Sequence, residues 1–97
     1  MSYFFHPAAE AELLESVGYY ESKVPGLGAA FLEEFDSLAT LVGEAPKAWQ
    51  VELQPDIRGA PLRTFPLSII YRETPDSFQV LAVAHHRRRP QYCFGRL

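Results

Sequence analysis

The sequence predicts an α+β domain of two layers, in which an N-terminal helical hairpin packs on a small antiparallel sheet. Apolar residues recur with helical spacing through the first half of the chain, and short β-branched and aromatic runs separated by turn residues fill the second half. The chain has 97 residues, the length of one domain, so residues 1–97 are expected to form a single unit. A composition of 47% hydrophobic and 22% charged residues excludes an intrinsically disordered chain.

The first expected elements are a short strand and a helix. Ser2–Phe5 is aromatic and β-prone, and Pro7 suits the first turn of a helix because it has no amide proton to leave unpaired. A helix is expected from Ala8 to about Lys23. Its apolar stripe has helical spacing and consists of Leu13, Val17, Tyr20 and Val24.

A second helix is expected from Leu27 to Val42, after a break at Pro25 and Gly26. Its apolar stripe consists of Leu27, Phe31, Phe35, Leu38 and Val42. Gly43 is expected to end this helix in a left-handed conformation. Because the turn between the two helices is so short, they are expected to form an antiparallel hairpin.

The second half is expected to form the sheet. Lys47 to Ile57 has mixed character and is predicted to be mostly loop, followed by strands at Ala60–Phe65, Leu67–Arg72 and Phe78–His85. Strict alternation in the last strand places Phe78, Val80, Ala82 and Ala84 on one face and Leu81 and Val83 on the other. Both faces are apolar, so this strand should be central, and the sheet face away from the helices is expected to be uncovered.

Charge divides the chain into two halves. Residues 1–50 carry eight acids and two lysines, a balance of −6, whereas residues 51–97 carry seven arginines and four acids, a balance of +3. The single cysteine, Cys93, excludes an internal disulfide, and no apolar run has the length of a membrane span. A cytoplasmic protein without membrane association is therefore expected, and the lack of zinc spacing and of a phosphate loop predicts neither metal nor cofactor.

The consecutive residues Arg87, Arg88 and Arg89, followed by Tyr92, form the most informative patch. Three neighbouring guanidinium groups repel one another and attract anions, and an adjacent aromatic ring can stack on a base, so the patch suits RNA. A solvated surface is the alternative interpretation. Neighbouring strand residues face opposite sides, so His85 and His86 are poorly placed to bind one metal, although either can act as an acid or base.

An ordered set of residues along the chain resembles the RelE/ParE superfamily of bacterial toxins from type II toxin–antitoxin systems. The set consists of Tyr19-Tyr20, Gly26-Leu27-Gly28, Phe31, Ala45-Pro46, Arg58, Phe65-Pro66, Ile70-Tyr71-Arg72, Val83-Ala84-His85 and Arg88-Arg89-Pro90-x-Tyr92. The resemblance implies a growth-inhibiting toxin neutralised by a cognate antitoxin protein. RelE-like members cut messenger RNA in the ribosomal A site, whereas ParE-like members block DNA gyrase and are not nucleases.

RNA cleavage requires a proton acceptor, a proton donor and cations that stabilise the charged transition state. The candidate catalytic residues for an mRNA interferase are Arg58, Arg63, His85, Arg88 and Tyr92, with Glu52 or His86 as other proton acceptors, and the candidate target-binding residues are Arg87, Arg88 and Arg89. This set favours a ribosome-dependent endoribonuclease. The alternatives are a gyrase inhibitor and a non-toxic binding module, and the absence of lysine from residues 51–97 counts against the nuclease.

Two further expectations concern packing and partner binding. Trp49, Phe65 and Phe78 adjoin apolar runs and are predicted to be largely buried. An antitoxin segment is expected to bind the sheet face away from the helices, or the outer helical stripe, as an added strand or an amphipathic helix.

Overall fold

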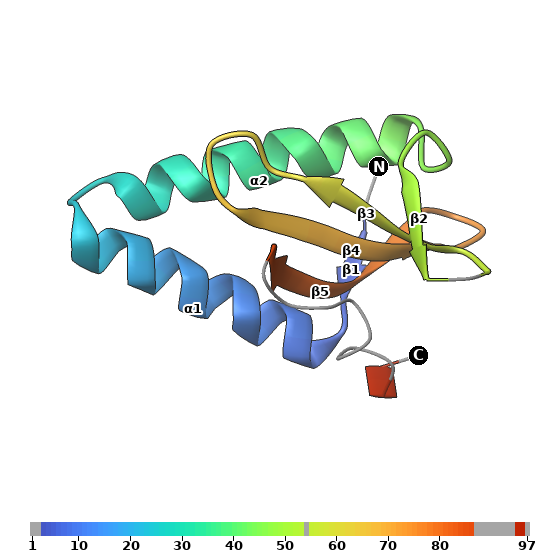
Figure 1. Cartoon of the computed structure of the whole chain (residues 1–97), viewed down its shortest axis with the longest axis horizontal. Coiled ribbons are helices and arrows are strands. Elements are labelled where there is room, and N and C mark those ends of the chain that lie inside the picture. Colours follow the sequence, from blue (N-terminus) through green and yellow to red (C-terminus); the bar gives the residue numbers. More distant parts are fainter. Residues whose placement is uncertain (1–2, 54, 87–94, 97) are drawn as a thin grey trace.

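The computed structural model describes residues 3–53, 55–86 and 95–96. Two helices and five strands follow in the order β1 (Phe4–Phe5), α1 (Pro7–Lys23), α2 (Leu27–Glu44), β2 (Gln50–Leu53), β3 (Ile57–Pro61), β4 (Leu67–Glu73) and β5 (Phe78–His85). The helices leave their connecting turn as the two arms of a V, and the sheet lies against them (Figure 1). The α+β class and the helical hairpin are confirmed.

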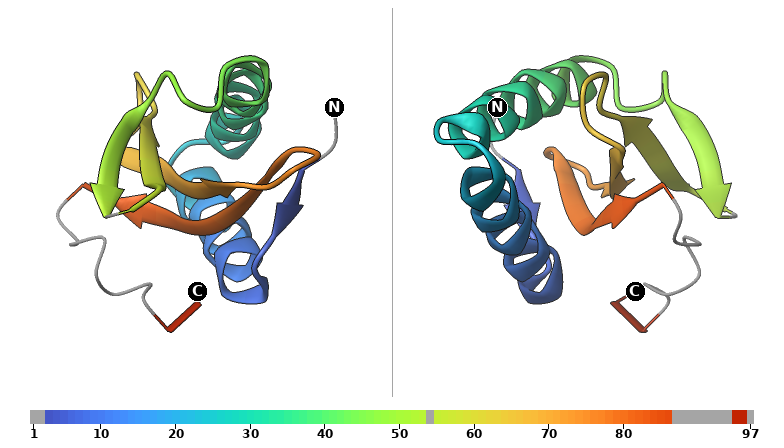
Figure 2. Two further views of the ribbon diagram at one scale, coloured as in Figure 1. Left: turned by 90° about the vertical axis from the view of Figure 1, so that its right-hand side faces the viewer. Right: turned by 60° about the vertical axis from the view of Figure 1, so that its left-hand side comes forward.

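The sheet is mixed rather than wholly antiparallel. Its strand order is β1-β5-β4-β3-β2, and β1 runs parallel to β5 while the other neighbours are antiparallel. The central position of β5 is confirmed, because β1 and β4 flank it. A parallel pair is possible here because two helices and three strands, not a tight turn, separate β1 from β5 in the chain. Figure 2 shows the strong twist that carries β2 away from the plane of β5.

Both ends of α1 are as predicted, at Pro7 and Lys23, but one residue of its predicted apolar stripe is not part of it. Pro7 occupies the first turn, and His6 caps the helix because its Nδ1 accepts a hydrogen bond from the amide of Ala8 at 3.1 Å. Leu13 is buried, but Val24 is 54% exposed, so its place in the apolar stripe was wrong. Val24 lies one residue beyond the helix, in extended backbone, and the helical spacing no longer applies there.

The helix α2 continues past the predicted end. The amide of Ala45 donates to the carbonyl of Leu41, so helical hydrogen bonding includes Gly43, and Gly43 is a buried helical residue rather than a left-handed cap. The left-handed glycine is Gly26, with φ of 90°, in the turn before α2. The predicted stripe is otherwise confirmed, with Phe31, Phe35, Leu38 and Val42 buried.

The hairpin turn is held by one carboxylate. Glu21 accepts hydrogen bonds from the amides of Gly26 at 2.8 Å and Gly28 at 2.9 Å, which satisfies two donors at the start of α2. The helices approach closely at Gly28, where an added Cβ would lie 2.7 Å from the carbonyl oxygen of Val17. Glycine is therefore required at this contact for steric reasons.

The segment predicted as a loop contains a strand. Residues Gln50 and Val51 pair with Gly59 and Arg58, so β2 is an edge strand with an irregular register. Its partner β3 covers Ile57–Pro61 rather than Ala60–Phe65. Short edge strands have little apolar periodicity because their ordering comes from the neighbouring strand, which explains why the sequence pattern missed β2.

A bulge in β5 overturns the predicted facing. Ile70 pairs with Ala82 and Tyr71 with Val80, so Leu81 is an extra residue and the alternation changes phase there. Phe78, Val80 and Val83 therefore belong to the core beneath the helices. A second apolar cluster contains Leu53, Ile57, Ile70, Leu81, Ala82 and Ala84.

The sheet has buried residues on both faces. The larger cluster joins both helices to the strands, and the second consists of buried strand residues alone. The expectation of an uncovered far face was therefore wrong for these residues. Phe65 and Phe78 are buried as predicted, at 6% and 1% exposure, whereas Trp49 is only partly buried against the first core.

Candidate functional site

The described candidate residues come from two strands and one loop. Arg58 lies on β3, Arg63 in the loop between β3 and β4, and His85 at the end of β5. The predicted residues Arg87, Arg88, Arg89 and Tyr92 lie outside the described residues.

Arg58 is tied to the segment that connects α2 with β2. Its Nη1 donates a hydrogen bond to the carbonyl oxygen of Trp49 at 2.7 Å, and it lies opposite Tyr71 in the register of β3 and β4. The hydroxyl of Tyr71 donates to the carbonyl oxygen of Pro46 at 2.5 Å. Burial is the main cause that raises the pKa of Tyr71 to about 12, with Arg58 lowering it and Glu73 adding to the rise, so this hydroxyl stays protonated. Two neighbouring side chains thus fasten residues 46–49 to the sheet.

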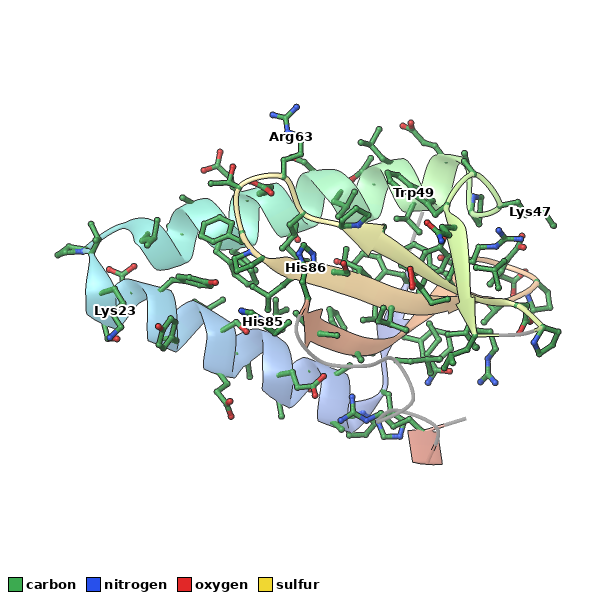
Figure 3. All side chains as sticks on the ribbon, in the orientation of Figure 1. Lys23, Lys47, Trp49, Arg63, His85 and His86 are labelled. Atoms are coloured by element: carbon green, nitrogen blue, oxygen red, sulfur yellow. The ribbon has the colours of Figure 1, made fainter. Side chains whose placement is uncertain are left out.

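Arg63 lies in an exposed loop that is fastened to α2 through backbone amides. The amides of Arg63 and Thr64 donate to Oε2 of Glu34 at 2.7 and 3.0 Å. Burial pushes the pKa of Glu34 upwards, but hydrogen bonds from Thr64 and Arg63 and the charge of Arg63 outweigh burial and lower it. Figure 3 shows the Arg63 side chain pointing away from the sheet on the α2 side.

The sheet register separates Arg58 from His85. Arg58 lies opposite Tyr71, and His85 lies opposite Leu67, so both side chains share the helix-facing side of the sheet. Tyr71 and Leu67 are four residues apart on β4, which corresponds to about 13 Å along the strand. Arg58 and His85 also lie on opposite sides of β4, on β3 and β5, which adds a separation of about 10 Å across the sheet. The fold thus places these two candidates at opposite ends of the sheet, with Arg63 outside it on a loop.

His85 lines an open cleft between α1 and the end of β5. The cleft has a volume of about 750 Å³ and is lined by Glu12, Glu15, Ser16, Tyr19, Tyr20, Pro66, Leu67, Val83 and His85. Burial, and secondarily Tyr19, raises the pKa of Tyr20. Figure 3 places His85 on the α1 side, away from Arg63. His86 follows in a turn in which its amide donates to the carbonyl of Pro66 at 2.9 Å. The described lining contains two carboxylates, of which that of Glu12 is paired with Arg96.

The two other proton-acceptor candidates lie at different ends of the sheet, and His86 is hydrogen-bonded to the loop that contains Arg63. Glu52 is an exposed residue of β2, and its side chain is the nearest neighbour of Gly59 on the edge of the sheet. His86 is exposed at the opposite end, beyond β5. The described part of the chain holds no cluster of three His, Cys, Asp or Glu side chains with metal-binding geometry.

Sequence reasoning missed an ion pair between Glu12 and Arg96. The guanidinium of Arg96 donates to both carboxylate oxygens of Glu12, at 2.9 and 3.1 Å, and to the carbonyl of Leu81 at 2.9 Å. The same carboxylate accepts the amide proton of Val83 at 3.0 Å. The partners are 84 positions apart in sequence, and neither belongs to a motif, so no local signal could have paired them.

Comparisons with known proteins identify the family to which this chain belongs. A solved structure described as the chromosomal ParDE TA system from P. aeruginosa has the same fold, with a TM-score of 0.73 over 88% of this chain and 95% of that chain, at 18% identity. The model of the ParE toxin of type II toxin–antitoxin systems, parDE, matches residues 3–90. The chain belongs to this ParE toxin family. A search of curated proteins found no match.

The family match confirms the resemblance to the RelE/ParE superfamily and the identification of the chain as a type II toxin-family protein. In the described ranges, no helix has the length and apolar character needed to cross a membrane.

Proposed function

We propose that this chain is a toxin that stops growth by binding a protein target, DNA gyrase, and that it does not cut RNA. Membership of the ParE family supports this target, because ParE-like toxins act on gyrase. The observation that carries the proposal is the separation of Arg58 from His85 along β4 and across it. Protein binding does not require these two groups to meet at one reacting phosphate.

The chemistry of RNA cleavage supports the same choice. A proton acceptor and cations must lie within hydrogen-bond reach of one scissile phosphate. Arg58 is engaged by the carbonyl of Trp49, and the cleft beside His85 contains the carboxylates of Glu12 and Glu15. The carboxylate of Glu15 beside His85 disfavours a phosphate there, whereas the charge of Glu12 is compensated by Arg96.

A ribosome-dependent endoribonuclease, which the sequence alone favoured, is the competing function. It would have to assemble His85 with Arg87, Arg88, Arg89 and Tyr92, the residues that follow it in the chain. A non-toxic binding module of the same fold is the third candidate. The first two candidates stop growth through different targets, whereas the third leaves growth unchanged.

A cognate antitoxin is the expected partner of such a toxin. Two docking surfaces were considered, the sheet face away from the helices and the outer surface of the helices. The apolar residues of that sheet face are buried, so the helices offer the better docking surface. Leu14 of α1 is 65% exposed, and Leu41 of α2, 52% exposed, lines an open cleft with Leu38 and Leu62. Leu32, at 40% exposure, lies nine residues before Leu41 and so points to the other side of α2. Exposed apolar side chains on a helix suit the apolar stripe of an amphipathic partner helix. Leu14→Glu and Leu41→Glu should weaken binding of the protein encoded beside this chain's gene, with little change in melting temperature.

A genetic selection tests the function directly. The chain is expressed from an inducible promoter in bacteria, and survivors with an intact, expressed toxin gene are sequenced. Resistance mutations in gyrase subunits are the expected result. Mutations in ribosomal components would indicate the nuclease instead, and normal growth on induction would indicate a non-toxic binding module.

A further inference from the structure

The strand β5 carries a segment with a strong tendency to pair with other strands. Its first seven residues, Phe78–Ala84, contain no charged residue and no proline, and all of them except Gln79 are buried. An uncharged, β-prone segment forms sheets between molecules when its edge is accessible. Both edges of β5 therefore need partners within the fold.

The two edges of β5 are covered to different extents. On one side, β4 pairs with β5 over its whole length, whereas on the other side β1 pairs only with Gln79 and Val80. The last backbone hydrogen bond on the β1 side runs from the amide of His6 to the carbonyl of Val80, at 2.8 Å. In the described ranges, no strand pairs with β5 on that side beyond this point.

The bulge at Leu81 adds a further backbone group that needs a partner. Carbonyls of successive strand residues normally point to opposite edges of the strand. Val80 and Leu81 are successive residues, yet both carbonyls have partners outside β4, the first in His6 and the second in the guanidinium of Arg96 at 2.9 Å. The extra residue of a bulge is left without a partner in the ladder, and here a side chain supplies one.

Glu12 and Arg96 together bond this edge as a neighbouring strand would. The carboxylate of Glu12 accepts the Val83 amide proton at 3.0 Å, while Arg96 donates to the carbonyl of Leu81. The two side chains also bond each other through two contacts, at 2.9 and 3.1 Å, so each orients the other. Their side chains are only 22% and 17% exposed, and such shelter reduces competition from water and salt.

We propose that Glu12 and Arg96 protect the edge of β5 from pairing with a second copy of this chain. A second copy fits the edge, because two β5 strands can pair antiparallel about a twofold axis and each presents the same uncharged segment. The pair opposes this contact, since an incoming strand would have to separate two sheltered charges from the Val83 amide and the Leu81 carbonyl. This role is independent of the target of the toxin.

Hydrogen exchange of the Val83 amide in the full-length chain tests the proposal. Glu12→Ala with Arg96→Ala removes both members, so no unpaired charge remains. At low protein concentration, the Val83 amide of this variant should exchange about tenfold faster than in wild type, because its acceptor is gone. At high concentration the variant should self-associate in sedimentation velocity, and exchange at Val83 should slow again, because a strand of the second copy accepts the proton. Wild type should remain monomeric at both concentrations.

Two further variants complete the experiment. Lys47→Ala with Glu73→Ala is the matched control, because it also removes one base and one acid, from an ion pair whose side chains are 76% and 36% exposed. It should behave as wild type in both measurements. Glu12→Gln keeps the size of the side chain and removes the charge that holds Arg96, so it should show both changes to a smaller extent, and it decides the question if the double variant does not fold.

Four outcomes would overturn the proposal. Unchanged exchange at Val83 would show that the pair does not close the edge. Faster exchange without self-association would show that the pair does not keep a second copy away. Self-association that leaves exchange at Val83 fast would place the contact elsewhere on the chain. Equally accelerated exchange of the β4 amides would show general loosening of the fold.

Discussion

The guanidinium of Arg58 donates a hydrogen bond to the carbonyl oxygen of Trp49 at 2.7 Å, and this contact gives the arginine a role in the fold. Arg58 belongs to β3, and Trp49 belongs to the segment before β2, so the bond fixes the approach of an edge strand to the sheet. A residue used in this way has less freedom to bind a phosphate. From the sequence alone, Arg58 was predicted only to bind a phosphate.

Arg58→Ala should therefore destabilise the protein. Loss of a hydrogen bond from a charged donor costs about 1.5–3 kcal/mol of the free energy of unfolding. Arg63→Ala is the control, because its exposed side chain should contribute within about 0.5 kcal/mol. Urea denaturation measures both variants. Equal midpoints for the two variants would contradict the structural role of Arg58.

A pair of glycine substitutions tests the close approach of the helices. Gly28→Ala places a Cβ 2.7 Å from the carbonyl oxygen of Val17 and should cost about 1–3 kcal/mol through overpacking. Gly18→Ala meets nothing within 4 Å and should stabilise α1 by about 0.5–1 kcal/mol, because alanine is the better helix former. Thermal unfolding should move the two melting temperatures in opposite directions; a common direction would refute the packing argument.

Acid should remove the contribution of Glu34. Hydrogen bonds from Thr64 and Arg63 lower its folded-state pKa, so the carboxylate stabilises the fold at pH values above the ordinary pKa of a glutamate. This stability is lost as the pH falls through the folded-state pKa. The melting temperature of Glu34→Gln should lie below that of wild type at pH 7, and the gap should shrink towards pH 3. Glu33→Gln removes the same charge from the same helix and corrects for net charge. A gap that is constant with pH would contradict the assignment.

The double variant Arg88→Ala with Arg89→Ala should lose growth inhibition and keep its melting temperature. The prediction follows from the sequence, because three of the seven arginines are consecutive and such a run favours an anionic partner surface. Growth on induction and thermal unfolding are measured together. A fully toxic variant would remove the run from the mechanism, and an unfolded variant would show that these arginines serve the fold.

Periodicity predicted the helical half of the fold well, because each helix buries one stripe. Phe31, Phe35 and Leu38 are spaced as a helix face requires, and all are buried. The pattern missed β2, whose ordering depends on its partner strand. It also missed the bulge at Leu81, because a continuous apolar run has no polar residue to mark a change of phase.

The candidate site was less predictable than the fold. Neighbours in sequence such as His85 and His86 were placed correctly at the end of β5, but the relation of Arg58 to His85 depends on the register across three strands. The pair of Glu12 and Arg96 is formed by opposite ends of the chain. Contacts of this kind arise from tertiary packing and leave no local pattern.

The most direct test of the account uses purified components. The chain is added to DNA gyrase in a supercoiling assay and, in parallel, to ribosomes translating a defined message. Inhibition of supercoiling with an intact message is the predicted result. Cleavage of ribosome-bound message with unaffected gyrase would contradict the proposed mechanism.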